Sequence, residues 1–348
     1  MITVNRLELI TAVKMHTDAL KVQESVFKKI ANKANDLLVH VDNNVIHLQT
    51  NRNFNLETRT ACLDTQGVER SISINAKDLL ALLEYSTDYE VEFKITEDAI
   101  KFTGLYGLPG FVPSERYEFN KGKMIESFDC DYNELKTAFN AIKYTIPSKD
   151  IRYYLNNAIY KKIAGVPHLL ASDGHRLVYT PLQLNCETEL FLPKWIAFIF
   201  SLKANYQVKI SIYEYHTEIQ SKDFTFLFAR DDVKYPNFDK VLNHNFISFK
   251  IDKKTLLTEL TRLHKIMPKH GAILSIKDDT LSLSTRDVTR EMAGQGQGQV
   301  EMGIMIAYAL AATKACKTKE IEIKIAENQS CAMFSDGTLN HIIMAMRL

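Results

Sequence analysis

Apolar positions along the chain alternate between helical and strand spacing, and the changes between the two outline a repeated unit. Apolar residues at helical spacing predict a helix from Arg6 to about Thr17. A charged loop and a second short helical or irregular stretch follow, with Lys21, Lys28, Lys29 and Lys33. Alternation with a period of two then predicts four strands, the last two as a pair: 37–41, 45–49, 56–63 and 68–74. A helix from about Ala76 and a hairpin over 91–102 complete this first unit.

The same order of elements follows twice more. Apolar spacing predicts further helices, each followed by strands: 132–144, one from Pro193, 253–267 and one from about Ile304. The three opening helices share a Leu-x-Thr pattern, beginning at Leu9, Leu135 and Leu256, with spacings of about 120 residues. This pattern is common by itself, but both series of helices keep the same order and phase. The chain is therefore predicted to contain a threefold internal repeat of helix, strands, helix and strands.

The repeat predicts an α+β protein in which two helices cover antiparallel sheet in each of three similar domains. A chain of 348 residues is also too long for a single core of ordinary size. The spacing of the opening helices places the domains at 1–125, 126–246 and 247–348.

The opening helices of the second and third repeats carry lysine opposite their apolar faces. Lys136 and Lys143 lie on the first of these helices, and Lys254 and Lys265 on the second, with few carboxylates beside them. An ordinary solvated face explains either helix by itself. The recurrence modestly favours the alternative, in which these faces meet a polyanion.

Composition limits the class of protein without announcing a function. Hydrophobic residues make up 46% of the chain, and 43 Lys and Arg against 42 Asp and Glu leave a formal charge of +1. The five cysteines are scattered and show no C-x-x-C spacing, which argues against disulfides or a structural zinc site. No signal core or membrane-spanning run is present. We expect a soluble cytoplasmic protein with reduced thiols.

The sequence contains no motif typical of an enzyme. A G-x-S-x-G nucleophile elbow and an H-E-x-x-H zinc motif are both absent. The run Gly294–Gln299 lacks the lysine and helix of a phosphate-binding loop and is predicted to form a mobile hairpin loop. A nuclease that uses acidic residues remains open on composition, although no spacing favours it: Asp173, Asp231, Asp232 and Asp336. We expect neither enzymatic activity nor a metal.

Asp173-Gly174 predicts a tight turn that places His175 and Arg176 at the start of a strand. One interpretation makes His175 a catalytic base. The simpler one is a surface hairpin, with His175 and Arg176 at the rim of a cleft. This stretch alone leaves both interpretations open.

Several short stretches stand in a characteristic order between residue 149 and the C-terminus: Lys149–Asn156, Ser172–Leu177, Leu190–Lys194, Tyr235–Leu242 and Met344–Leu348. Together they resemble the bacterial β sliding clamps, the processivity subunits of replicative DNA polymerases. The resemblance covers the middle domain and the C-terminus, while the remainder agrees mainly in pattern. Ala345 stands where that family usually has proline, and Lys240 replaces an arginine and loses its bidentate geometry. These departures indicate a divergent clamp.

The resemblance implies a protein without cofactor or catalysis that forms a head-to-tail homodimer. Two chains would close a six-domain ring around duplex DNA, held by phosphate contacts that ignore base sequence. The residues implied in DNA contact are Lys28, Lys29, Lys136, Lys143, Lys149, Arg152, Tyr153, Tyr154, Lys254 and Lys265. Those implied in the dimer contact are Leu105, Tyr106, Leu108, Ile266 and Met267, although Pro109 removes a backbone donor from the first of the two strands.

The resemblance also implies a cleft that binds short, partly apolar peptides of the replicative polymerase, the clamp loader and other DNA-processing proteins. Its implied wall is Leu155, Ser172, Gly174, His175, Arg176, Leu177, Pro236, Lys240, Val241, Ile342, Met344 and Met346. Apolar side chains that include methionine suit a pocket that adapts to several ligands. The alternative is a clamp-related adaptor that binds peptides without encircling DNA.

Overall fold

The structure, a computed structural model, describes residues 1–26, 37–51, 54–111, 119–163, 165–201, 207–230 and 235–347. Lys28 and Lys29, assigned above to DNA contact, lie outside the described residues, as do Asp231 and Asp232. Within the described ranges, no helix combines the length and the apolar character needed to cross a membrane.

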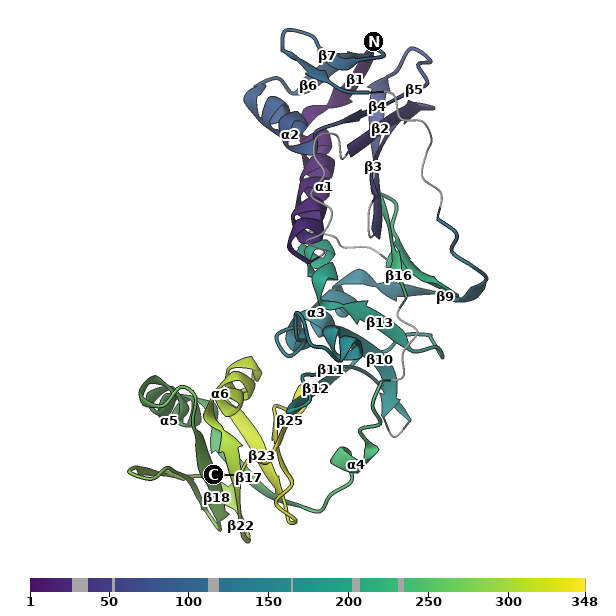
Figure 1. The fold of residues 1–348 in the computed structure, drawn as a ribbon. Helices are drawn as coiled ribbons and strands as arrows, with labels where there is room; N and C mark the ends of the chain where they lie inside the picture. Colours follow the sequence, from purple (N-terminus) through teal and green to yellow (C-terminus); the bar gives the residue numbers. More distant parts are fainter. Residues whose placement is uncertain are drawn as a thin grey trace. The chain divides into compact units, whose positions relative to one another are not determined.

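Helices and antiparallel strands follow one another in the order predicted from the sequence (Figure 1). The first repeat consists of β1 (Ile2–Asn5), α1 (Arg6–Val26), β2 (Leu37–Asp42), β3 (Val45–Asn51), β4 (Phe54–Asp64), β5 (Arg70–Ile74), α2 (Ala76–Tyr85), β6 (Glu90–Ile95), β7 (Ala99–Phe102) and β8 (Gly107–Pro109). The second consists of β9 (Met124–Asp131), α3 (Tyr132–Ile142), the 3₁₀ helix η1 (Tyr153–Asn156), β10 (Asn157–Ile163), β11 (Val166–Ser172), β12 (Arg176–Pro181), β13 (Leu190–Pro193), the 3₁₀ helix η2 (Lys194–Ser201), β14 (Gln207–Tyr213), β15 (His216–Gln220) and β16 (Phe224–Ala229).

The third repeat follows a short helix, α4 (Asp239–Leu242). It consists of β17 (Phe246–Asp252), α5 (Lys253–Ile266), β18 (Gly271–Lys277), β19 (Thr280–Ser284), β20 (Thr289–Ala293), β21 (Gln295–Gly296), β22 (Gln299–Met305), α6 (Ile306–Ala315), β23 (Glu320–Ala326), β24 (Cys331–Ser335) and β25 (Asn340–Met344). Apart from β21, η1 and α4, each repeat is a strand, a helix, four strands, a helix and three strands. The predicted threefold repeat of α+β units is therefore confirmed.

Strand pairing follows one rule in all three repeats. The first strand and the last three form one antiparallel sheet, in the orders β1-β6-β7-β8, β9-β14-β15-β16 and β17-β23-β24-β25. The four strands between the two helices pair in the orders β4-β3-β2-β5, β12-β11-β10-β13 and β20-β19-β18-β22. In the first repeat, β1 also pairs with β4 and joins the two groups of strands into one sheet. Three copies of one topology thus arise from three segments of different sequence.

Neighbouring repeats are joined strand to strand, by equivalent strands at each junction. The last strand of the second repeat, β16, pairs with β4 of the first, from Phe224↔Thr58 to Phe228↔Phe54. The last strand of the third repeat, β25, pairs with β12 of the second, from Arg176↔Ile343 to Tyr179↔Asn340. The last strand of one repeat therefore extends the four-stranded sheet of the repeat before it.

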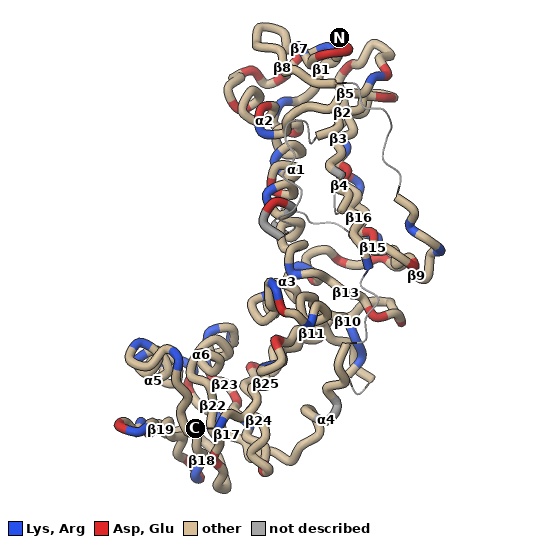
Figure 2. The backbone as a smooth tube through the Cα atoms, in the orientation of Figure 1, with Lys and Arg blue, Asp and Glu red and all other residues tan. Residues whose placement is uncertain are grey.

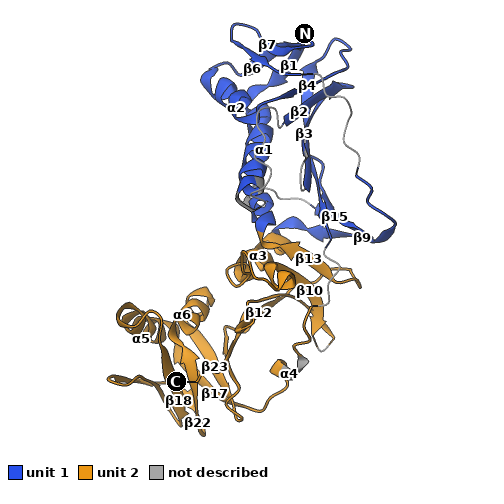
Figure 3. Ribbon diagram, viewed as in Figure 1, with its two compact units in different colours: residues 1–133, 195–231 blue, residues 134–194, 232–348 orange. Residues whose placement is uncertain are grey.

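The chain divides into two compact units, 1–133 with 195–231 and 134–194 with 232–348 (Figure 3). Each unit holds one outer repeat together with the sheet of the middle repeat that pairs with it. In the first unit, Leu9 and Val13 of α1 and Leu83 of α2 are buried in one apolar core. In the second, Leu260 of α5 and Ile306 of α6 belong to the corresponding core.

Helix α1 is longer than predicted, because it continues without a break from Thr17 to Val26, where a charged loop and a second short helical or irregular stretch were expected. Ala19 and Leu20 are fully buried, so the apolar face continues into the charged stretch. No glycine or proline interrupts these residues, and Lys21 pairs with Asp18 one turn earlier at 2.9 Å. Polar residues here belong to the outer face of a long amphipathic helix.

One further sequence prediction is wrong in detail. The strands β4 and β5 do not pair with each other: β4 pairs with β3, and β5 pairs with β2 on the opposite side of the same sheet. The helix predicted from Pro193 is present, as the 3₁₀ helix η2. Its first turn carries Trp195, whose ring stacks on Phe54 at 4.9 Å, and such bulky side chains have low helix propensity.

The Gly294–Gln299 run is not a hairpin loop, because β20 and β22 lie at opposite ends of their sheet. Instead, the run crosses to the other sheet of its repeat, where β21 pairs with β17 at Gly296↔Phe249. A Cβ atom on Gly296 would lie 2.6 Å from the Phe249 ring, and one on Gly294 would lie 2.5 Å from it. The two glycines are needed because an aromatic ring lies against the backbone.

His16 of α1 is fully buried between β3 and β4, where its ring nitrogens lie 3.1 Å from Thr50 Oγ1 and 3.0 Å from Thr58 Oγ1. Burial lowers the pKa of His16 from 6.5 to about 3. The unfolded chain therefore binds more protons in this range, so the stabilisation present above pH 6.5 is lost as the pH falls toward 3.

We expect the loss to reach about 2 kcal/mol at about pH 5, and a His16→Gln variant to show a flatter decline of Tm between about pH 7 and pH 5. Calorimetry on both proteins measures this difference, with exposed His270 replaced in the same way as the control. An equal decline in the His16 variant and the wild type would show that His16 is not the group responsible.

Candidate functional site

The Asp173-Gly174 turn between β11 and β12 has the geometry that the sequence predicts. Oδ1 of Asp173 accepts hydrogen bonds from the backbone N–H groups of His175 and Arg176, both at 3.0 Å. Oδ2 of Asp173 accepts a further bond from Nε of Arg176 at 2.8 Å. Ser172 closes the turn from the other side, since its Oγ donates to the Arg176 carbonyl and accepts from the Gly174 N–H. The turn is therefore held rigidly.

Gly174 is required at this turn by its backbone conformation, because its φ of +87° is in the left-handed region. A Cβ atom there would also lie 2.4 Å from Nη1 of Arg152, the far end of a flexible side chain that would have to move. The Arg152 guanidinium also donates to the Asp173 carbonyl at 3.1 Å and to both carboxylate oxygens of Asp150. Hydrogen bonds from Arg152 hold the pKa of Asp150 down at about 2, so this ion pair persists at neutral pH.

Arg176 lies between two tyrosine rings. Its guanidinium carbon is 4.6 Å from the ring centre of Tyr308 on α6 and 5.4 Å from that of Tyr144. The Tyr144 hydroxyl shares a hydrogen bond of 2.6 Å with Nδ1 of His341 on β25, and burial lowers the pKa of His341 to about 3. Neutral His341, two rings and Asp173 thus hold one guanidinium in place, with its charge compensated.

The junction between β12 and β25 brings the C-terminal end of the chain beside this turn. Leu177 is opposite Ile342 in the ladder, and the Met344 N–H donates to the His175 carbonyl at 2.9 Å. Beneath these strands, Leu177 and Ile342 are buried in a cluster with Leu155 of η1, and Val241 of α4 packs against this cluster. Segments distant in sequence therefore form one apolar floor.

These elements enclose a pocket of about 230 Å³, smaller than the roughly 300–1,000 Å³ of a site for a drug-sized molecule. Apolar groups form most of its surface, with two arginines and a serine at its edge. Its lining is Arg152, Tyr154, Leu155, Ser172, Gly174, Arg176, Leu177, Pro236, Phe238, Val241 and Met344. A pocket of this size and character suits apolar side chains of a peptide, each contributing about 1.5–3 kcal/mol on burial.

Eight of the twelve residues proposed for a peptide cleft line this pocket. Of the others, Ile342 is fully buried beneath it, and His175 is exposed outside it while its carbonyl binds Met344. Met346 is half-buried and donates its N–H to the Gly303 carbonyl. Lys240 belongs to α4, and its side chain lies outside the described structure.

The residues proposed for DNA contact occupy several places in the fold. Lys136 and Lys143 are half-buried, on and just after α3, while Lys254 and Lys265 are exposed on α5 (Figure 2). Lys149 and Tyr153 are exposed in and after the loop that leads to η1. Arg152 and Tyr154 instead line the pocket. The loop from Lys149 to Tyr154 is thus continuous with the pocket wall.

The residues proposed for the dimer contact lie around β8 and at the end of α5. Leu105 and Leu108 are partly buried against the core of the first repeat, and Tyr106 is exposed. Ile266 is 71% exposed at the last position of α5, and Met267 packs partly against the core of the third repeat. Among these five residues, Tyr106 and Ile266 are therefore the two with largely exposed side chains.

The nuclease interpretation gains nothing from the two acidic residues that the structure describes. The Asp173 carboxylate is occupied by its own turn and by Arg176. Asp336 accepts backbone N–H groups from Lys317, Thr338 and Leu339. Both carboxylates therefore hold the backbone, and among the described residues no three His, Cys, Asp or Glu side chains gather as metal ligands.

Sequence reasoning missed three members of the pocket and two supporting rings. Phe238 belongs to the stretch Tyr235–Leu242 that was singled out, and its aromatic character beside Pro236 was an available signal. Arg152 and Tyr154 were noticed, but for another role. Tyr144 and Tyr308 gave no signal, because only the folded chain brings them to Arg176.

The complete chain has the fold of the DNA sliding clamps. The DNA polymerase III β subunit of Pseudomonas aeruginosa superposes over 100% of both chains with a TM-score of 0.86 at 19% sequence identity. The Caulobacter crescentus pol III β structure gives a TM-score of 0.86 at 17% identity, again over 100% of both chains. The Thermotoga maritima β subunit, at 16% identity, gives 0.82 over 100% of this chain and 99% of that one.

The sequence is similar to curated proteins named Beta sliding clamp. The one from Pseudomonas aeruginosa is 21% identical over 241 residues, which span 64% of this chain and 66% of that protein. The one from Vibrio cholerae is 20% identical over 334 residues, 80% of this chain and 90% of that protein. No family model matches the chain. The chain is thus similar in fold and in sequence to the bacterial β sliding clamps, and the match to the Pseudomonas aeruginosa protein spans about two thirds of that relative.

Proposed function

We propose that the protein is a DNA sliding clamp, a homodimeric ring of six domains that encircles duplex DNA and tethers polymerases and other DNA-processing proteins. The domains are 1–125, 126–246 and 247–348, and the protein works in the cytoplasm without catalysis or cofactor. The clamp fold over the complete chain and the relatives named Beta sliding clamp support this function.

The pairing of strands between neighbouring repeats is the main support for a ring. At both junctions within the chain, the last strand of a repeat pairs with the outer strand of a four-stranded sheet: β16 with β4, and β25 with β12. The same rule requires β8, the last strand of the first repeat, to pair with β20 of a third repeat. Both strands end their sheets among the described residues. A second copy of the chain supplies each missing partner, and two such head-to-tail contacts close a ring.

The residues proposed for the dimer contact fit this pairing. Leu108 is the central residue of β8, and Ile266 ends the helix that packs against β20 through Glu259 and Arg290. Pro109 cannot donate to the ladder, so β8 offers only Gly107 and Leu108 as backbone donors. Apolar contact between Leu108, its neighbours and Ile266 therefore supplies most of the stabilisation.

The positions of the lysine and arginine residues, rather than the net charge of the chain, support DNA contact that is independent of base sequence. A net charge of +1 gives no bulk attraction, but a closed ring needs only weak phosphate contacts, because topology retains the DNA. Lys136 lies on α3 and Lys143 just after it, while Lys254 and Lys265 lie on α5, the equivalent opening helix of the third repeat. Arg152 and Tyr154 belong to both proposed surfaces, since they line the pocket as well.

The pocket is the proposed docking site for partner peptides. Its apolar floor accepts hydrophobic side chains, and Arg176 and Arg152 stand at its edge with their charges already compensated. A structurally similar clamp from Pseudomonas aeruginosa has been solved with bound griselimycin, at 18% identity and a TM-score of 0.83. A pocket for a ligand of this kind supports an equivalent site in the present chain.

Retention on circular DNA tests the ring. Protein dissociated and reassembled in the presence of a nicked plasmid is expected to remain on the DNA through a high-salt wash, and to leave once the plasmid is linearised. Sliding off an end needs no bond to break, whereas phosphate contacts alone weaken with salt on either form of DNA. Gel filtration of the complexes before and after linearisation measures the difference.

Equal retention on circular and linear DNA would contradict encirclement. A protein that stays monomeric at micromolar concentration, fails to remain on the plasmid and still binds peptides would instead be an adaptor. Light scattering on the same samples separates these outcomes.

A further inference from the structure

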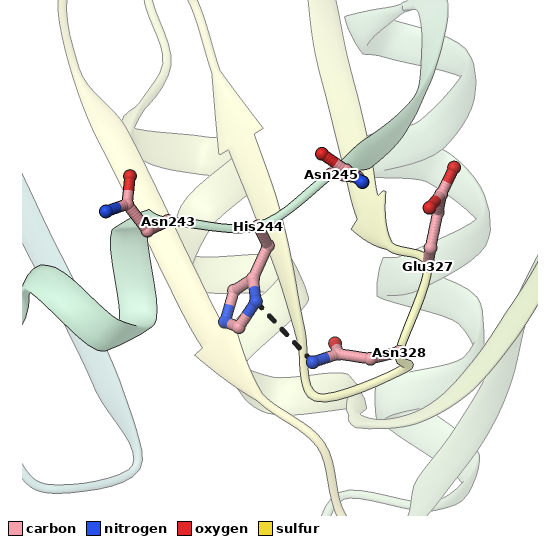
Figure 4. A pocket seen from close by; sticks show the side chains of 5 residues that line it. All are labelled: Asn243, His244, Asn245, Glu327 and Asn328. Carbon is pink, nitrogen blue, oxygen red and sulfur yellow. Dashed lines mark hydrogen bonds between the residues drawn. The ribbon is translucent and has the colours of Figure 1, made fainter.

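A second, polar hollow of about 430 Å³ lies in the unit that contains the apolar pocket. Its walls are the segment after α4, with Asn243, His244 and Asn245, and the turn between β23 and β24, with Glu327 and Asn328. Figure 4 shows the His244 ring and the Asn328 side chain facing each other, with Asn245 and Glu327 on neighbouring segments. The Glu327 N–H donates to the Asn245 carbonyl at 3.0 Å and ties the two walls together.

One part of this hollow is already organised by hydrogen bonds. Nδ1 of His244 lies 3.5 Å from Nδ2 of Asn328, and Nε2 lies 3.4 Å from Oγ of Ser330. Ser330 in turn donates from Oγ to Oδ1 of Asn328 at 2.7 Å. The imidazole and one amide therefore keep their places before a ligand arrives, which lowers the entropic cost of binding.

The side chains of the other part, Asn243, Asn245 and Glu327, are exposed to solvent. No hydrogen bond or ion pair to the side chains of Asn243, Asn245 or Glu327 exists within the described part of the chain. Glu327 carries the one fixed formal charge among the five lining residues, which include neither lysine nor arginine. The Glu327 carboxylate and the amide oxygens can accept hydrogen bonds from a positively charged donor, and the carboxylate repels another carboxylate.

The hollow adjoins the apolar pocket through shared elements. Val241 lines the apolar pocket, and Asn243, two residues later, lines the hollow. On the opposite wall, the Ala345 N–H donates to the Ser330 carbonyl at 2.9 Å, immediately after pocket-lining Met344. Residues two apart lie within about 7 Å, a distance that two or three residues of an extended peptide span. One peptide can therefore enter both.

We propose that this polar hollow binds an arginine or lysine side chain of the same partner peptide that fills the apolar pocket. The proposal rests on the proposed docking function of that pocket and adds a requirement for its ligands: a basic residue within about two to four positions of the apolar anchor. The anchor supplies affinity, and Glu327 with the three asparagines selects among partners by charge.

Selection from a displayed library of random decapeptides on the purified full-length protein tests this requirement. We expect selected sequences to combine an apolar anchor with arginine or lysine at one preferred distance, and the same selection on a Glu327→Gln variant to lose the basic residue. Glu301→Gln is the matched control, because Glu301 is also exposed but lies on β22. Its selection should reproduce that of the wild type.

Fluorescence anisotropy on one selected peptide and its Arg→Ala version then measures the coupling. The basic residue is expected to strengthen binding about three- to tenfold on the wild type and to make no difference on Glu327→Gln. Selection of acidic residues or uncharged amides at that position, or an unchanged effect of the basic residue on Glu327→Gln, would overturn the proposal. If either of these contradicting results were found while Met344→Glu still abolished peptide binding, the docking function of the apolar pocket would stand and only the polar site would be refuted. Peptides indifferent to Met344→Glu would instead refute the docking function itself.

Discussion

A Met344→Glu variant is expected to lose peptide binding by more than about 100-fold while its fold stays intact. Met344 is 37% exposed at the last position of β25 and lines the apolar pocket. Its backbone N–H, which binds the His175 carbonyl, is unaffected by the side chain. The variant forfeits about 1.5–3 kcal/mol of apolar contact and places a carboxylate where a peptide would desolvate it, at a further cost of about 1–3 kcal/mol.

Substitution is a sharper test here than removal of the C-terminal residues. The N–H groups of Ala345 and Met346 donate to the carbonyls of Ser330 and Gly303, so truncation would also disturb two backbone contacts. Fluorescence anisotropy with a selected peptide measures affinity, and thermal unfolding checks stability. Met124→Glu is the control, since Met124 is exposed in the other unit. Full affinity in the Met344 variant would remove this pocket as the docking site.

An Ile266→Glu variant is expected to convert a dimer into a monomer. Ile266 is an exposed isoleucine at the end of α5, and in the proposed ring each chain buries one copy. Loss of about 2 kcal/mol at each of the two contacts weakens dimerisation about a thousandfold. Light scattering across a dilution series measures this change, and retention on nicked plasmid should disappear with it.

The control for this variant is Ile125→Glu, which places the same charge at an exposed isoleucine on β9. Its dimer should dissociate at the same concentration as that of the wild type. A dimer that withstands Ile266→Glu but dissociates with Ile125→Glu would place the contact elsewhere and overturn the pairing of β8 with β20.

Local patterns predicted the parts of this fold that local chemistry determines. The turn at Asp173-Gly174 follows from an aspartate that accepts hydrogen bonds from the backbone after it and from a glycine at positive φ. The Asp-Gly dipeptide alone is enough to predict it. The order of helices and strands follows from apolar periodicity in the same way. Eight residues that line the pocket were named as well, but through resemblance to clamps rather than from their own pattern.

Non-local pairing set the limit of those predictions. The sequence of β4 does not determine whether it pairs with β16 or with β5, because either pairing would bury the same apolar residues of β4. The glycine-rich run was misjudged for a related reason: Phe249, far away in sequence, is what requires glycine there. The bonds from Arg152 to Asp150 and to the Asp173 carbonyl, which place it beside the pocket, likewise appear only in the folded chain.

The backbone conformation of Gly174 has a consequence for tracing remote relatives of this chain. Any other residue would adopt an unfavourable backbone conformation there and would displace the Arg152 guanidinium. Lys240, by contrast, stands where clamps usually have arginine, and Ala345 where they have proline, so rim and tail positions tolerate drift. In sequences that have diverged too far for a family model to match, this pocket is therefore better recognised by the Asp-Gly pair than by the positions of Lys240 and Ala345. An arginine some twenty residues before the pair completes the pattern.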